Sequence, residues 1–166
     1  MKKKKVIIPL LVILAIGIIL GTRMWFRTEN NEPEEMSAGV ILDKNAVAYT
    51  NQELKEASEN AVPGSIRFPG YPDVTVKSST MEIPIVLANP EGNPCYFQFS
   101  VVVEETGEKL LQSDWVEPGK AIEGIALSEP LEAGDYQLVL QISTSALESG
   151  TTMNGGNVKT GLHVIA

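Results

Sequence analysis

Few residues of this chain have the chemistry that catalysis requires. His163 is the sole histidine and Cys95 the sole cysteine, so these two alone cannot complete a zinc site. His163 lies in an apolar stretch near the C-terminus, where a structural role is expected before that of a general base. Glu104 and Glu105 are neighbours, and neighbouring side chains of a strand point to opposite faces, which is wrong for two cooperating carboxylates.

The sequence also lacks the short motifs of nucleotide-dependent and nucleophilic enzymes. It contains no phosphate-binding loop, dinucleotide fingerprint or nucleophile elbow. We therefore predict no catalytic residue, no cofactor and no metal site. Cys95 cannot form a disulfide within the chain, and its aromatic neighbours predict a buried position, with a bridge between two copies as the alternative.

Three residues are the candidates for a binding surface. Trp115 and Asn154 fall in predicted loops, and Tyr71 is a separate aromatic in a turn rich in proline and glycine. Loops on a rigid scaffold are the usual place for recognition. The alternative is that Trp115 covers the edge of the core and that the asparagines serve turns. No ligand follows from these residues alone.

Apolar and polar residues alternate from residue 65 onward, which predicts β-strands. The main predicted strands are 81–87, 95–105, 108–112, 120–127, 135–145 and 158–165. Pro84 predicts an unpaired strand side or a bulge, and Gly124 predicts a second bulge. A total of about seven or eight short strands, with turns about every 8–12 residues, predicts an all-β antiparallel sandwich.

The order of the strands also predicts where the loops lie. With the first five of these strands as B, C, C′, E and F of a Greek-key sandwich, the loops 88–94, 113–119 and 146–157 share one end. Trp115 and Asn154 therefore lie at the same end of the predicted domain, which makes them the first residues to test.

The first 26 residues predict a membrane anchor. Lys2 to Lys5 precede an apolar run, and 6–26 is long enough, at about 1.5 Å per residue, to span a hydrocarbon core of about 30 Å. The lysines place the N-terminus in the cytoplasm, and Trp25 and Phe26 suit the far interface. A cleaved signal peptide is the alternative, but Ile18 to Leu20 continue the apolar run past the small residues.

The rest of the chain divides at a change in composition near residue 62. The predicted parts are a basic cytoplasmic stub 1–5, the anchor 6–26, an acidic spacer 27–62 and an extracytoplasmic sandwich 63–166. Within the spacer, Thr50 and Glu53 predict a capping box that opens a short helix to about residue 60. Residues 39–42 predict a short strand or a patch that docks onto the domain.

Charge is divided unequally along the chain. Residues 1–27 hold six Lys/Arg and no acid, whereas 28–166 hold seven Lys/Arg and 21 Asp/Glu, a net charge of −14. Such an acidic domain repels phosphate backbones, which disfavours nucleic-acid binding. The predicted partners are the membrane, through the anchor, and a protein or wall polymer outside the cell. The oligomeric state is left open.

One short motif resembles a known family of domains. Residues 131–136, Leu-Glu-Ala-Gly-Asp-Tyr, resemble the approach to strand F in immunoglobulin-like and fibronectin-III-like domains. This resemblance implies an immunoglobulin-like sandwich in which the Tyr136 hydroxyl bonds back to the backbone and pins the corner between strands. The cysteine pair and core tryptophan of antibody domains are absent, so the resemblance is to the general sandwich.

A second resemblance covers most of residues 65–166. The stretches that carry it are Asn89-Pro90-Glu91, 93–97, 118–122 and Gly134-Asp135-Tyr136. Together they are similar to small anchored surface proteins of Gram-positive Firmicutes, which implies a location and a fold. We therefore predict a single-pass anchored β-sandwich that acts outside the cell as a non-enzymatic binding or scaffolding module within a cell-surface assembly. The alternatives are a carbohydrate-binding module for the cell wall and a hydrolase accessory, with His163 as its only obvious base.

Overall fold

The structure is a computed structural model of the chain, and it describes residues 36–37, 39–52, 62 and 64–166. The predicted stub, the predicted anchor 6–26 and the predicted helix beyond Gln52 lie outside these residues. Within the described ranges, no helix is long and apolar enough to cross a membrane.

The described residues form ten β-strands. They are β1 Met36–Ser37, β2 Val40–Ile41, β3 Val47–Ala48, β4 Val74–Lys77, β5 Glu82–Asn89, β6 Cys95–Val103, β7 Lys109–Val116, β8 Lys120–Ala126, β9 Gly134–Ala146 and β10 Thr152–Ile165. β1 and β2 pair with each other, and the other eight build two larger sheets.

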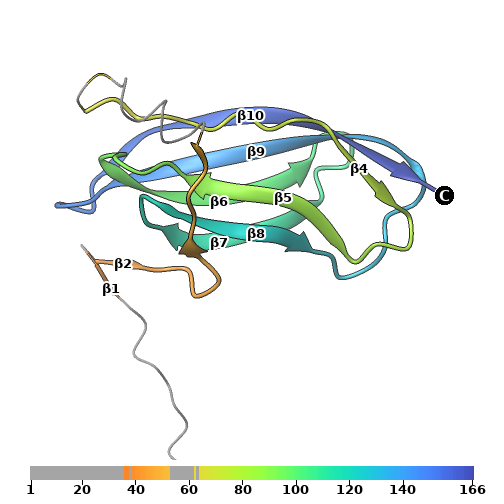
Figure 1. Cartoon of the computed structure of the whole chain (residues 1–166), viewed down its shortest axis with the longest axis horizontal. Helices are drawn as coiled ribbons and strands as arrows, with labels where there is room; N and C mark the ends of the chain where they lie inside the picture. The colour runs from red at the N-terminus through yellow and green to blue at the C-terminus, as the bar shows by residue number, and fades with distance from the viewer. Residues whose placement is uncertain (1–35, 38, 53–61, 63) are drawn as a thin grey trace, which may run out of the picture. The chain divides into compact units, whose positions relative to one another are not determined.

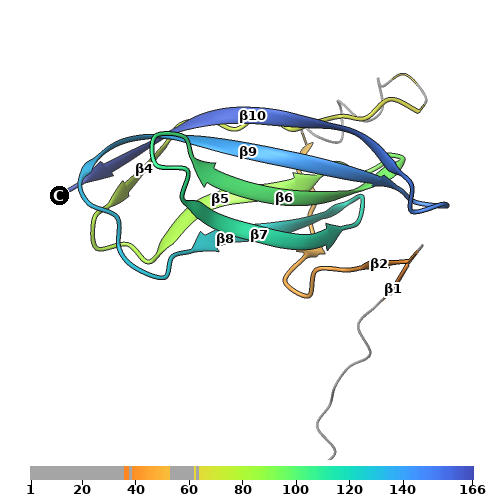
Figure 2. The same cartoon turned by 180° about the vertical axis from the view of Figure 1, so that it is seen from behind.

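The two larger sheets form a sandwich (Figure 1). One has five strands in the order β4-β10-β9-β6-β7, and the other has three in the order β3-β8-β5. Figure 2 shows the same layers from behind, with β10, β9, β6 and β7 in front of β5 and β8. The prediction of an all-β sandwich is confirmed. Its strands pair antiparallel as predicted, except that β4 runs parallel to β10.

The core between the sheets is built by the predicted alternation of side chains. Apolar residues at every second position are buried, among them Ile83 and Leu87 on β5, Phe97, Phe99, Val101 and Val103 on β6, and Leu138 and Leu140 on β9. Phe97 lies at the centre of an aromatic group: Phe99 meets it edge-on at 5.9 Å between ring centroids, and Phe68 stacks on it at 5.3 Å. Cys95 is buried, as predicted, and free.

The strand corner implied by the resemblance is present. The Tyr136 hydroxyl donates a hydrogen bond to the carbonyl of Glu132, at 2.9 Å. The bond closes the turn that leads into β9, and Tyr136 packs against the core at the same time. The predicted role of this tyrosine is confirmed.

Of the two bulges predicted for these strands, one is present. On β5, Ile83 pairs with Ile125 and Val86 pairs with Glu123, so the extra residue lies in β5, at Pro84 or Ile85. The bulge predicted from Pro84 is confirmed. The bulge predicted in the facing strand at Gly124 is wrong, because Gly124, with φ 77°, is the single residue opposite the β5 bulge.

The region predicted as the loop 113–119 is instead strand as far as Val116, so Trp115 lies in β7 and pairs with Gln98. The extra residue of a bulge between Trp115 and Gln112 explains the difference. There the buried Ser113 hydroxyl accepts a hydrogen bond from the backbone N–H of Phe99, at 2.8 Å. The Ser113 hydroxyl, a group typical of loops, thus takes the place of a backbone carbonyl as the partner of the Phe99 N–H inside the sheet.

The region predicted as the loop 146–157 is mostly strand as well. β9 ends at Ala146 and β10 begins at Thr152, so Asn154 lies in a strand. β9 and β10 are also the two longest described strands, with 13 and 14 residues. The Gly, Thr and Asn residues that suggested a loop fit a register shift between Met153 and Gly156.

The described part of the predicted spacer packs on the sandwich. β3 pairs with β8 and extends the three-stranded sheet. Val40 and Leu42 are buried in a small cluster with Tyr96, against which Trp115 also packs, and Asp43 Oδ2 accepts from the N–H of Asp114 at 2.9 Å. Residues 39–42 were predicted to form a short strand or a docking patch, and the structure shows both: β2 covers Val40–Ile41, and Val40 and Leu42 pack on Tyr96.

A buried amide connects three strands at one end of the sandwich. Asn89, at 1 % exposure, donates through Nδ2 to the carbonyls of Cys95 and Val116, each at 2.9 Å. Its Oδ1 accepts from Asn93 Nδ2 at 2.8 Å. The Asn93 side chain in turn bonds both backbone groups of Arg67, at 2.9 and 3.0 Å. Asn89 and Asn93 therefore hold the turn between β5 and β6, as expected if the asparagines serve turns. Through Arg67 they also hold the segment that leads into β4.

We predict that Asn89→Ala lowers the free energy of unfolding by about 3 kcal/mol, because the carbonyls of Cys95 and Val116 lose the donor that Asn89 supplies and Asn93 Nδ2 loses one of its two acceptors. Chemical denaturation monitored by tryptophan fluorescence measures the change. Asn157→Ala is the matched control: this asparagine is exposed on β10, and its loss is expected to change stability by no more than about 0.5 kcal/mol. Equal effects of the two substitutions would contradict the role given to Asn89.

Candidate functional site

The structure does not bring the three predicted site residues together. Trp115 is half-buried and packs against the Val40 and Leu42 cluster. Asn154 is exposed and borders an open depression with Phe68 and Met153. Tyr71 is half-buried instead of standing on the surface, and its ring packs against the main core. Of the three, Tyr71 is the one that lines a well-formed cavity.

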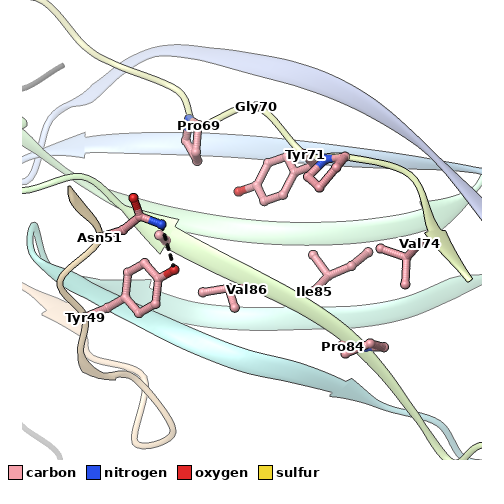
Figure 3. A pocket seen from close by; sticks show the side chains of 11 residues that line it. Tyr49, Asn51, Pro69, Gly70, Tyr71, Val74, Pro84, Ile85 and Val86 are labelled. Carbon is pink, nitrogen blue, oxygen red and sulfur yellow. Dashed lines mark hydrogen bonds between the residues drawn. The ribbon is translucent and has the colours of Figure 1, made fainter. Parts of the chain in front are cut away.

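This cavity, of about 330 Å³, lies between the segment that leads into β4 and the strand β5. One wall is the segment from Pro69 to Val74, and the other is the β5 stretch from Pro84 to Ala88. Tyr49 and Asn51 close one end (Figure 3). We call this cavity, with these lining residues, the β5 groove. Its volume is at the lower end of the range for small-ligand sites, about 300–1,000 Å³.

The polar groups of the β5 groove are few. Asn51 Nδ2 donates to the Tyr49 hydroxyl at 3.4 Å. The Tyr71 hydroxyl is buried and makes no hydrogen bond with any described residue. Burial raises the pKa of Tyr71 above its ordinary value, so the hydroxyl keeps its proton and remains a donor at neutral pH. Figure 3 shows the ring of Tyr71 across the groove from β5, with its hydroxyl on the side of Asn51.

The β5 wall of the groove is an edge of the three-stranded sheet, because β8 is the only described strand that pairs with β5. The Asn89 carbonyl accepts from the N–H of Gly119 at 2.8 Å, so Asn89 faces β8. Backbone groups alternate in direction along an antiparallel strand, which turns those of Val86 and Ala88 toward the groove. No residue of the described ranges donates to or accepts from them there. Val86 and Ala88 therefore present an unpaired strand edge.

The lining of the groove is largely apolar. Its lining contains no His, Cys, Asp or Glu, and the described part of the chain holds no group of three such residues placed to hold a metal ion. Apolar walls with a few oriented donors and acceptors are typical of recognition sites. Two residues of this site carried a signal in the sequence: Tyr71 was a candidate binding residue, and Pro84 indicated an edge strand or a bulge, since proline inside a sheet favours an edge. Nothing in the sequence pointed to Tyr49 or Asn51.

His163 belongs to a different face of the molecule. It lies on β10 opposite Asp135 of β9, and its Nδ1 is 2.6 Å from Asp135 Oδ1. The hydrogen bond to Asp135 raises the pKa of His163, and the charges of Asp135 and Asp73 act in the same direction. His163 lies in the part of β10 that also pairs with β4, where its partner is Thr75. Neither His163 nor Asp135 lines the β5 groove.

Comparisons with known proteins add one distant structural likeness. No protein-family model matches the chain, and no curated protein matches it. Among solved structures, the chain is similar to the crystal structure of CopC from Methylosinus trichosporium OB3b, at 15% identity and a TM-score of 0.31, over 55% of this chain and 84% of that one. A likeness this distant says nothing about a ligand or an activity.

We predict opposite effects of removing the hydroxyl from two tyrosines. Tyr136→Phe deletes a formed hydrogen bond and lowers the free energy of unfolding by about 1 kcal/mol. Tyr71→Phe deletes a buried hydroxyl that has no partner and raises it by about 1 kcal/mol. Urea denaturation of the two variants beside the parent measures both. A loss of stability in Tyr71→Phe would show that its hydroxyl is already bonded.

We predict that NMR titration of His163 gives a pKa above the ordinary histidine value and that Asp135→Asn lowers it. Because the pKa is raised in the folded state, protonated His163 stabilises the fold below the ordinary pKa, and this contribution is lost as pH rises through the raised pKa. His163→Gln should remove that part of the pH dependence of unfolding. A titration unchanged by Asp135→Asn would contradict the pairing.

Proposed function

We propose that this chain is a membrane-anchored module whose acidic, immunoglobulin-like sandwich binds or scaffolds a partner outside the cell without catalysing a reaction. The immunoglobulin-like assignment is supported by the strand pairings. With β5 to β10 as strands B, C, C′, E, F and G, B pairs with E, and G, F, C and C′ form the other sheet, as in variable-type domains. The parallel β4–β10 pair and the Tyr136 corner add to this.

The proposed location rests on the N-terminal sequence. Four lysines precede the apolar run 6–26, and the acidic remainder carries a net charge of −14 from seven Lys/Arg and 21 Asp/Glu. Positive charge favours the cytoplasmic side of a span, which leaves the sandwich on the other side. The similarity to small anchored surface proteins of Gram-positive Firmicutes is in keeping with this location and with the proposed role in a cell-surface assembly.

The observation that carries the proposed binding role is the β5 groove. It combines an apolar lining, a buried hydroxyl and a strand edge that no described residue pairs, and its lining holds no His, Cys, Asp or Glu. Trp115, the tryptophan among the candidate binding residues, packs against the cluster of Val40 and Leu42, where its ring is half-buried and less open to a sugar. A protein partner is therefore favoured over a wall polysaccharide.

We predict that a photo-crosslinking amino acid at Pro84, in the full-length chain in its native cells, forms an adduct outside the cytoplasm. Pro84 is exposed and lines the groove. The matched control is the same amino acid at Lys109, which is exposed on β7 and does not line the groove. Protease added to intact cells should remove a tag placed after Ala166.

Survival of that tag until lysis would contradict the proposed topology. Adducts at Lys109 equal to those at Pro84 would contradict a binding role for the groove.

A further inference from the structure

We propose that the β5 groove binds an extended peptide segment of a partner protein, which adds as a strand to the Val86–Ala88 edge of β5. The proposal rests on the proposed binding function and names its ligand class. In this mode, main-chain hydrogen bonds supply the affinity, and alternate side chains of the added strand enter the groove.

The edge is suited to a short added strand. Val86 and Ala88 direct two N–H donors and two C=O acceptors away from β8, and no described residue meets them. Pro84 has no N–H, and the bulge beside it interrupts the ladder, so the usable edge begins at Val86. The usable edge, Val86–Ala88, is about 10 Å long, at about 3.3 Å per residue. Ala88 is buried, so its unpaired backbone groups carry a cost that an added strand would remove.

The opposite wall offers a second, independent point of attachment. A strand beside β5 has a far edge whose carbonyls point away from β5, toward the segment that holds Tyr71 (Figure 3). The Tyr71 hydroxyl is a buried donor without a described partner on that wall. An extended peptide satisfies both the β5 edge and this hydroxyl, because its two edges carry the same repeating groups. Ile85 and Val74 supply apolar surface for the side chains between them.

Charge and geometry define the partner further. Asp73 and Glu82, both exposed, flank the lining stretches of the groove, and residues 28–166 carry a net charge of −14. A second copy of the chain is therefore repelled, and its own β5 would meet this edge with Pro84, which cannot donate. The segment that fits is extended, apolar at alternate positions and basic or neutral at its ends.

The test uses the full-length chain in detergent and a phage-displayed library of random eight-residue peptides. Peptides enriched on the parent chain and depleted by counter-selection on Val86→Pro are synthesised, and their affinities are measured by calorimetry. Val86→Pro removes one edge N–H without touching the β8 ladder, whereas the matched control Val86→Thr keeps that N–H. We expect binding at least tenfold weaker for Val86→Pro, severalfold weaker for Tyr71→Phe, and within twofold of the parent for Val86→Thr.

A second measurement does not depend on the folding of any variant. N-methylation of alternate peptide residues removes N–H groups from one strand edge at a time, so methylation on the edge that faces β5 should abolish binding to the parent. Peptides that bind Val86→Pro as well as the parent, or that tolerate methylation of both edges, would overturn strand addition while leaving the binding function in place. No enriched peptide would also overturn it, and the crosslinking at Pro84 would then decide the broader function separately.

Discussion

The side-chain amide of Asn89 is the interaction on which the arrangement around the groove depends. Its two N–H groups hold the carbonyls of Cys95 and Val116, and its oxygen holds Asn93. Both N–H groups of the amide and its oxygen are therefore hydrogen-bonded. A buried polar network whose groups are bonded in this way makes the fold rigid and specific. One residue at the end of β5 thereby fixes the start of β6, the end of β7 and the turn between β5 and β6.

The same network decides the path of the chain before β4, and that path leaves β5 with an edge that no described strand pairs. Asn93 holds the backbone of Arg67, and Phe68 stacks on Phe97 at 5.3 Å, close to Gly156. Farther along, Thr160 Oγ1 donates to the Pro72 carbonyl and the Gly161 N–H donates to Asp73, both at 2.7 Å. These bonds attach the segment to β10. It therefore joins the five-stranded sheet and does not pair with β5.

This path explains which features could be predicted from the sequence. Strands, core positions and the Tyr136 corner are local, because they follow from alternation and from a short motif. Trp115 was misplaced because Ser113 has the composition of a loop while its hydroxyl takes a backbone partner inside the sheet. The groove was not predictable, because it depends on contacts such as Arg67 with Asn93 and Asp73 with Gly161, which are 26 and 88 residues apart. No local pattern encodes such a choice between sheets.

The groove departs from the rule that buried polar groups are paired, whereas the Asn89 network obeys it a few residues away. Across one small space, the buried Tyr71 hydroxyl and the edge groups of Val86 and Ala88 have no hydrogen-bond partner among the described residues, and at the buried Tyr71 and Ala88 this costs stability. Pro84 and the bulge beside it limit this edge, as edge strands that resist uncontrolled pairing do. The remaining opening at Val86 and Ala88 is short, and Tyr71 faces it. Sites that keep such a cost inside a well-satisfied fold are the places where binding is expected, because a ligand that completes the hydrogen bonds gains the free energy the fold alone does not recover.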